Sequence, residues 1–171
     1  RTKEPSYIPF YKERSAVGEE NVHIDFGFHF GIQREEHIHE IEAIVAETGV
    51  RSFKLYFGYE AVNPIGIVPA TDGWVYATMR KAAQIPGGVV SVHCENTGIA
   101  TWLKEELIAT GRQDLGAFTE SRPAFCEVET IHRMIFLAEL TGCPLYVVHT
   151  TAGQGPVVAE AARARGVDVT I

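Results

Sequence analysis

The chain has 171 residues, of which 46% are hydrophobic and 22% are charged, a composition typical of one soluble globular domain over residues 1–171. Its formal net charge of -7 argues against nucleic acid or an anionic membrane as a partner, and no apolar run is long enough to span a membrane. The three cysteines are widely spaced and form no CxxC pair, so we expect reduced thiols and a cytoplasmic location.

The first part of the chain predicts two strands with a helix between them. Residues 21–30 (NVHIDFGFHF) alternate strictly between apolar and polar side chains, as a strand with one buried face does. In residues 34–49 isoleucine and valine recur at helical spacing, and Gly49 fits a C-terminal cap. The second predicted strand, residues 52–59 (SFKLYFGY), carries one charge, Lys54, in a run that is otherwise apolar.

The rest of the chain repeats the order of strand and helix. Thr71 is a suitable N-cap for the first of the later helices. The later predicted strands are residues 87–96, 143–150 and 167–171, and the later predicted helices are residues 72–85, 97–111, 127–142 and 153–166. Strands separated by helices of about 10–15 residues imply right-handed βαβ units and a parallel sheet.

Such a sheet either stays open, as in a doubly wound fold, or closes into a (β/α) barrel. The glycine fingerprint of a dinucleotide fold is absent, since TTAGQGP (residues 150–156) only approaches it. The alternating first strand favours the barrel, whose interior accepts polar side chains near the active end. A full barrel has eight strands and typically ~250 residues, whereas this chain offers about five strands. We therefore expect a partial (β/α)8 TIM barrel that is a piece of a larger one.

Three polar residues stand near the carboxyl ends of predicted strands, where barrel enzymes build their sites: Lys54, His93 and His149. His149 is expected on the same strand face as Leu145 and Val147. Taken singly, each histidine fits a hydrogen-bonded structural residue, and the lysine fits a side chain that reaches solvent. The coincidence of all three favours a functional site.

A chemical role explains the lysine. Burial pushes a lysine toward its neutral amine, and a neutral amine can add carbon dioxide to become a carbamate. The carbamate has two oxygens and can bridge two divalent cations, while the imidazoles of His93 and His149 complete the shell of one cation. Water between two cations loses a proton near neutral pH and can act as the nucleophile.

Four segments in this order carry a family resemblance: SFKLYFGY, VVSVHCEN, SRPAFCEVETIHR and CPLYVVHTTAG. Together they resemble the cyclic amidohydrolases of the hydantoinase and dihydropyrimidinase family. The resemblance runs from about Val22 to the end of the chain and covers only the middle of the family's barrel.

The resemblance implies that Lys54 is a carboxylated lysine bridging two metal ions, with zinc as the expected metal, and that His93 and His149 bind the second ion. It implies that Tyr59 is a catalytic residue whose hydroxyl supports the oxyanion formed when a hydantoin or 5,6-dihydropyrimidine ring opens. It also implies a homotetramer. The family's HxH pair and its catalytic aspartate are expected outside these residues, so we expect the isolated chain to be inactive.

Other polar residues are weaker candidates for the functional site. The histidines of residues 37–39 fall in a predicted helix and are expected on a solvated face. His29 shares a strand face that could line the barrel. Residues 95–96 follow a proposed ligand and could orient it. Glu127 and Glu129 are expected to pack or cap rather than to catalyse.

Two other functions stay open. Allantoin or dihydroorotate could replace hydantoin as the ring that is opened. The chain could also belong to the non-catalytic relatives that use the same barrel in assemblies, although those have typically lost the metal-binding lysine and histidines, and Lys54, His93 and His149 are all present here.

Overall fold

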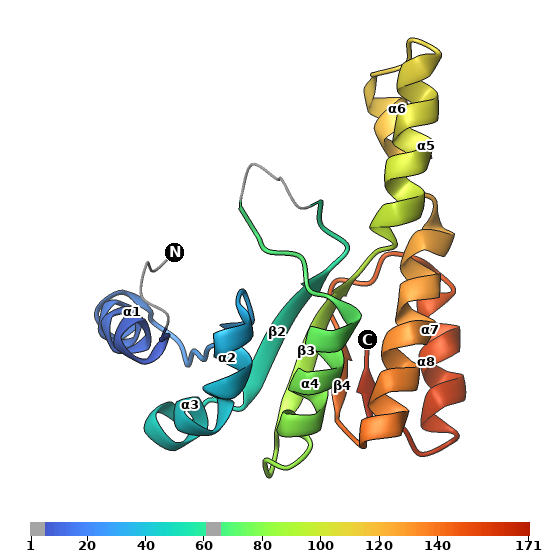
Figure 1. Cartoon of the computed structure of the whole chain (residues 1–171). Coiled ribbons are helices and arrows are strands. Elements are labelled where there is room, and N and C mark those ends of the chain that lie inside the picture. Colours follow the sequence, from blue (N-terminus) through green and yellow to red (C-terminus); the bar gives the residue numbers. More distant parts are fainter. Residues whose placement is uncertain (1–5, 61–65) are drawn as a thin grey trace.

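The computed structural model describes residues 6–60 and 66–171. Five parallel strands form one sheet in the order β1-β2-β3-β4-β5 (Figure 1). The strands are β1 (Phe30–Gly31), β2 (Ser52–Phe57), β3 (Val89–Cys94), β4 (Leu145–Val147) and β5 (Val169–Thr170). Each strand pairs with the next one along the chain, so this sheet lacks the reversal of order that defines a doubly wound fold. The order is the one that a barrel requires.

Eight helices accompany the described strands. They are α1 (Ile8–Asn21), α2 (Glu35–His39), α3 (Ile41–Thr48), α4 (Asp72–Ala82), α5 (Thr97–Ala109), α6 (Leu115–Glu120), α7 (Ala124–Thr141) and α8 (Gly155–Arg163). Helices α5 and α6 project together beyond the end of the sheet (Figure 1). The sequence did not predict α1, which has no fully buried side chain, or α6 within residues 112–125. None of the described helices is long and apolar enough to cross a membrane.

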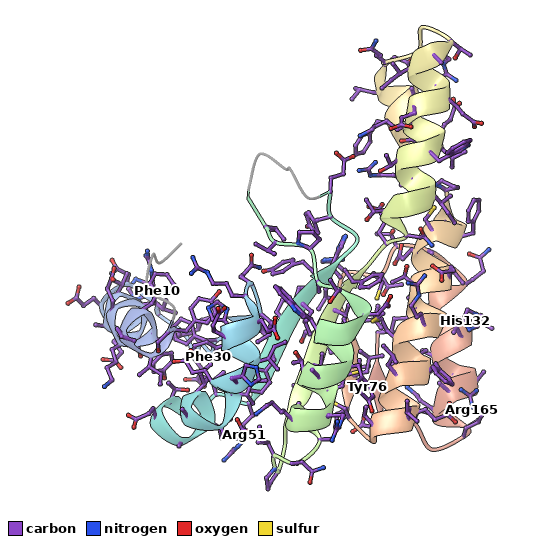
Figure 2. The ribbon with its side chains drawn as sticks, in the orientation of Figure 1. Phe10, Phe30, Arg51, Tyr76, His132 and Arg165 are labelled. Carbon is purple, nitrogen blue, oxygen red and sulfur yellow. The ribbon has the colours of Figure 1, made fainter. Side chains whose placement is uncertain are left out.

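The core lies on one face of the sheet, under α4, α7 and α8. Alternate side chains of the three central strands are buried there, with exposed fractions of 0–1%: Phe53, Leu55, Val90, Val92, Leu145 and Val147. They meet Met79 of α4, Met134 of α7 and Ala159 of α8 in one cluster. Burial of each of the valine, leucine, phenylalanine and methionine side chains contributes about 1.5–3 kcal/mol. His132 lies on the outer side of α7 and is exposed (Figure 2).

Side-chain and glycine caps fix where several helices begin and end. Thr71 Oγ1 accepts a hydrogen bond from the Trp74 N–H at 3.2 Å and starts α4. Gly49 ends α3 in the left-handed region, with φ 72°. Both predicted caps are therefore confirmed. Asn96 starts α5 in the same way, since its Oδ1 accepts from the Ile99 N–H at 3.1 Å.

The first predicted strand was largely wrong. Of residues 21–30 only Phe30 belongs to β1, and Ile24 is 80% exposed. Strand β1 pairs with β2 through Phe30 and Phe53, and β2 begins at Ser52. Residues before position 29 therefore have no strand of the described sheet beside them, and alternation alone does not make a strand without a partner.

The predicted helix over residues 34–49 is divided at Glu40 into α2 and α3. The short helix α2 turns His37 inward, where it is 2% exposed and its ring lies 4.1 Å from the ring of Tyr7. The expectation of a solvated face was thus wrong for His37, whereas His39 is exposed.

Two leucines test the placement of the core. Leu55 is fully buried and Leu140 on α7 is 62% exposed. We expect Leu55→Ala to lower the free energy of unfolding by about 2–5 kcal/mol, because it removes packed methyl groups and leaves a cavity. The matched change Leu140→Ala should stay within about 0.5 kcal/mol of the wild type. Urea denaturation measures both, and equal losses would contradict this core.

Candidate active site and metal centre

The register of the parallel strands brings the predicted site residues to one face. Lys54 on β2 stands beside Ser91 on β3, and Tyr56 stands beside His93. Lys54 alternates with the buried side chains of its strand and so points to the face opposite α4 and α7. Strand pairing alone therefore places Lys54 and His93 on the same side of the sheet.

The Lys54 amine is buried without a hydrogen bond. Its Nζ has no hydrogen-bond partner among the described residues, and it lies 5.1 Å from the centre of the Tyr56 ring. Burial lowers the pKa of Lys54 to about 8 because the charged form is poorly solvated there. This lower pKa increases the neutral fraction of the amine near neutral pH, and the neutral amine is the form that reacts with electrophiles.

The two candidate histidines meet at the ends of β3 and β4. His93 Nδ1 lies 3.3 Å from His149 Nε2, and the ring centres are 4.9 Å apart. Burial lowers the pKa of His93 to about 4, and the neighbouring His149, Lys54 and Arg122 add to the effect. The His93 imidazole is therefore neutral at pH 7 and keeps a lone pair for a metal ion.

His149 reaches this position through its backbone rather than through strand alternation. Strand β4 ends at Val147, and His149 adopts φ 45°, the single non-glycine positive φ among the described residues. Leu145 and Val147 face the helices, so the predicted shared face for His149 was wrong. The left-handed conformation turns the ring toward His93 instead, at a cost on the order of 1 kcal/mol.

Tyr59 joins the cluster because Gly58 precedes it. The Tyr59 ring lies 4.8 Å from the His93 ring and 5.8 Å from the Tyr56 ring. Gly58 has φ 119°, and a Cβ at this position would lie 2.5 Å from the carbonyl oxygen of Glu95. Only glycine, which has no Cβ, allows the backbone at position 58 to pass this close to the Glu95 carbonyl. The sequence predicted Tyr59 as a site residue but not Gly58, although a glycine directly after a strand is a signal for such a turn.

A pocket of about 370 Å³ opens beside the histidines, and its lining includes His93, His149 and Glu127. Arg122 lies at 3.5 Å from Glu95 in the same wall. Burial raises the pKa of Glu95, and Arg122 partly offsets this effect. The cluster therefore has an accessible space in which a small polar molecule could lie.

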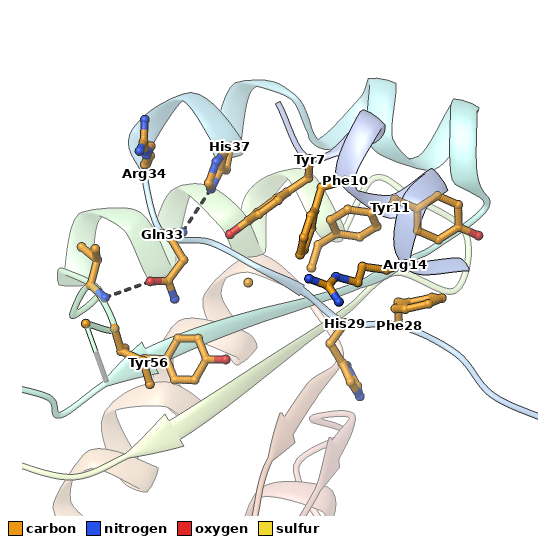
Figure 3. Close-up of a pocket in the computed structure, with 15 residues that line it drawn as sticks. Tyr7, Phe10, Tyr11, Arg14, Phe28, His29, Gln33, Arg34, His37 and Tyr56 are labelled. Atoms are coloured by element: carbon orange, nitrogen blue, oxygen red, sulfur yellow. Dashed lines mark hydrogen bonds between the residues drawn. The ribbon is translucent and has the colours of Figure 1, made fainter. Parts of the chain in front are cut away.

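A second pocket, of about 620 Å³, lies between α1 and the first two strands (Figure 3). Its wall includes the rings of Tyr7, Phe10, Tyr11 and Phe28. Tyr56 and Gly31 also line it, and both lie beside Lys54. His29 contacts Ser52, the first residue of β2, and so lies at the opposite end of that strand from Tyr59.

The donors present fit a metal ion when Lys54 is counted among them. Among the described residues no three side chains of histidine, cysteine, aspartate or glutamate converge. His93 offers a neutral imidazole beside the ring of His149, and the Lys54 amine on the same face of the sheet has no hydrogen-bond partner among the described residues. A carbamate on Lys54 would supply the oxygen ligands that the two imidazoles lack. Cys94 adds nothing, because burial raises the pKa of its thiol to about 12.

Comparison with known proteins identifies relatives along most of the chain. No family model matches. The chain is 38% identical to a D-hydantoinase of Streptomyces coelicolor over 152 residues, 88% of this chain and 31% of that protein. It is 36% identical to an allantoinase of Rubrobacter xylanophilus over 155 residues, 91% of this chain and 33% of that protein. It superimposes on the crystal structure of a dihydropyrimidinase from Brevibacillus agri with a TM-score of 0.82 and 27% identity, covering 99% of this chain and 36% of that one.

These comparisons confirm the expected fold class, an α/β structure that forms part of a (β/α)8 barrel. The chain belongs to the hydantoinase family of cyclic amidohydrolases. It spans about a third of the length of the relatives that it matches, 31% and 33% of the two proteins above.

Gly58 provides a test of the cluster geometry. We expect Gly58→Ala to destabilise the chain by about 2–4 kcal/mol, because the new Cβ meets the Glu95 carbonyl, and to separate the Tyr59 and His93 rings. Gly49→Ala is the control, since Gly49 has φ 72° with open space around it and should cost only about 1 kcal/mol. Urea denaturation and the nuclear Overhauser effect between the two rings measure the outcome. An unchanged distance between the rings in Gly58→Ala would contradict this account.

Proposed function

We propose that this chain contributes to a hydrolase that opens cyclic amide rings, of the hydantoin or 5,6-dihydropyrimidine kind, at a binuclear metal centre bridged by a carboxylated Lys54. One observation carries the proposal: a buried amine without a hydrogen-bond partner lies on the same face of the sheet as two adjoining imidazoles. The names of the relatives, D-hydantoinase, allantoinase and dihydropyrimidinase, support this class of substrate.

Each residue has a defined part in this proposal. The neutral Lys54 amine forms an N–C bond to carbon dioxide and releases one proton to solvent, which leaves an anionic carbamate with two oxygens. His93 and His149 hold one of the two divalent cations, expected to be zinc, through their ring nitrogens. When bound, the cations polarise the ring carbonyl and lower the pKa of water.

Tyr59 would donate its phenol O–H to the oxyanion that forms as the cyclic amide is attacked. Its ring contact with His93 keeps the hydroxyl near the ligand cluster. Donors of this kind contribute on the order of 10²–10³ in rate.

An allantoinase is the second candidate. The relative from Rubrobacter xylanophilus carries that name at 36% identity, and allantoin contains the same five-membered hydantoin ring. Neither the relatives nor the solved structure described above is a dihydroorotase, and a non-catalytic role is disfavoured because Lys54, His93 and His149 are all present. A cytoplasmic homotetramer without nucleic-acid or membrane partners completes the proposal.

Lys54 provides the first test of this function. With zinc and ¹³C-bicarbonate we expect a carbamate carbon signal and bound zinc in the wild-type chain. We expect Lys54→Ala to lose the signal and most of the zinc, because the bridging ligand is gone. Lys81→Ala is the control, since Lys81 forms an ion pair with Glu42 on the outer surface. Carbon NMR, intact mass and metal analysis measure the result, and zinc content that is unchanged in Lys54→Ala would refute the bridge.

Hydrolysis provides the second test. The described residues supply only Lys54, His93 and His149 to the centre, fewer donors than two cations require. We therefore expect the 171-residue chain to open hydantoin or dihydrouracil at no more than the background rate, even with zinc and bicarbonate. A direct assay of ring opening measures this, and robust turnover would show that this donor set is already sufficient.

A further inference from the structure

We infer that Glu127 is a positioning residue that holds His149 in place for metal binding. The inference rests on the proposed function, because it takes His149 to be a metal ligand. It assigns a role to a residue that the sequence alone predicted only to pack or cap.

The carboxylate of Glu127 accepts three hydrogen bonds from the loop that follows β4. Oε1 accepts from the Thr151 N–H at 2.8 Å, and Oε2 accepts from the Thr151 hydroxyl at 2.7 Å and from the Ala152 N–H at 3.0 Å. A charged acceptor makes such bonds roughly twice as strong as neutral ones. The loop directly after His149 is thus tied to the first turns of α7.

A capping role does not explain these bonds. Glu127 lies in the first turn of α7, where a carboxylate interacts favourably with the positive end of the helix. In the described structure, however, its hydrogen bonds go to Thr151 and Ala152 across the pocket, not to N–H groups of α7. The Glu127 carboxylate therefore binds the loop after β4 and does not cap α7.

His149 lies between two fixed points. On one side the Val148 N–H donates to the Val92 carbonyl at 3.2 Å and continues the β3–β4 pairing. On the other side Thr151 is held by Glu127, so only His149 and Thr150 span the interval. A left-handed φ at a non-glycine residue persists when its surroundings over-determine it, and the Glu127 contacts supply the second anchor.

The same helix also supports the end of β3. Glu129 Oε2 accepts from the Asn96 side-chain amide at 2.7 Å, and the Cys126 carbonyl accepts from the Asn96 N–H at 2.9 Å. Asn96 lies three residues after His93, and Thr151 lies two residues after His149. Helix α7 therefore fixes the two loops that carry the two imidazoles, through glutamates two residues apart.

The decisive variant is Glu127→Gln, which keeps the size of the side chain but replaces one acceptor oxygen by an NH₂ group that faces donors. We expect zinc affinity, measured by titration calorimetry on the full chain, to fall about 10- to 100-fold. In the metal-free protein we expect the nuclear Overhauser effect between the His93 and His149 rings to disappear. Glu139→Gln is the matched control, because Glu139 is on the same helix and pairs with Arg165 at 3.0 Å, away from the site.

A double-mutant cycle separates positioning from a loss of general stability. In a His149→Ala background, Glu127→Gln should cause no further loss of zinc affinity, because the residue through which it acts is gone. Two results would overturn the inference. One is the same loss of zinc affinity in Glu127→Gln with and without His149. The other is wild-type zinc affinity in Glu127→Gln together with an intact Overhauser effect between the two rings.

The proposed function can fail separately. If the wild-type chain binds no zinc, or if His149→Ala leaves zinc affinity unchanged, the metal centre is refuted. In that case the Overhauser effect between the two rings in the metal-free protein decides alone whether Glu127 holds His149. An effect that disappears in Glu127→Gln and persists in Glu139→Gln supports positioning, and one that persists in both variants overturns it.

Discussion

The parallel register of β2, β3 and β4 is the constraint on which the rest of the site depends. Lys54, Ser91 and Tyr146 are partners across these three strands, so the strands end at comparable heights. The core face is packed against α4, α7 and α8, and a shift of one residue would turn Lys54 into that apolar core. Hydrophobic burial on one face therefore fixes where the polar groups stand on the other.

Much of this fold could be predicted from the sequence because local patterns and burial agree. The alternation around Lys54, the apolar run before His93 and the cap at Thr71 each have one good structural solution. Residues 21–30 show what a local pattern does not determine. Their alternation is as regular as that of β2, yet pairing needs a neighbouring strand, and a pattern within ten residues carries no information about one.

The candidate site was predictable in its members but not in its geometry. Lys54 and His93 stand out by their positions near strand ends, whereas Tyr59 is indicated only by the family resemblance. The contact of His149 with His93 depends on a left-handed backbone conformation, which violates alternation. Gly58 matters because its backbone lies close to Glu95, a residue that is distant in the chain. Contacts between segments far apart in the sequence decide both features, and local periodicity does not report them.

Burial sets the protonation preferences of Lys54 and His93 before any ligand binds. Burial favours the neutral amine of Lys54 and the neutral ring of His93, and each cation that forms would raise the cost of the other. The Lys54 amine, which is buried without a hydrogen-bond partner among the described residues, costs free energy in the folded chain. Helix α7 keeps this arrangement from relaxing, because Glu127 and Glu129 hold the loops after β4 and β3 in hydrogen bonds that do not involve the imidazoles. The two imidazoles therefore contact each other, with His93 Nδ1 3.3 Å from His149 Nε2, rather than the loops that α7 holds.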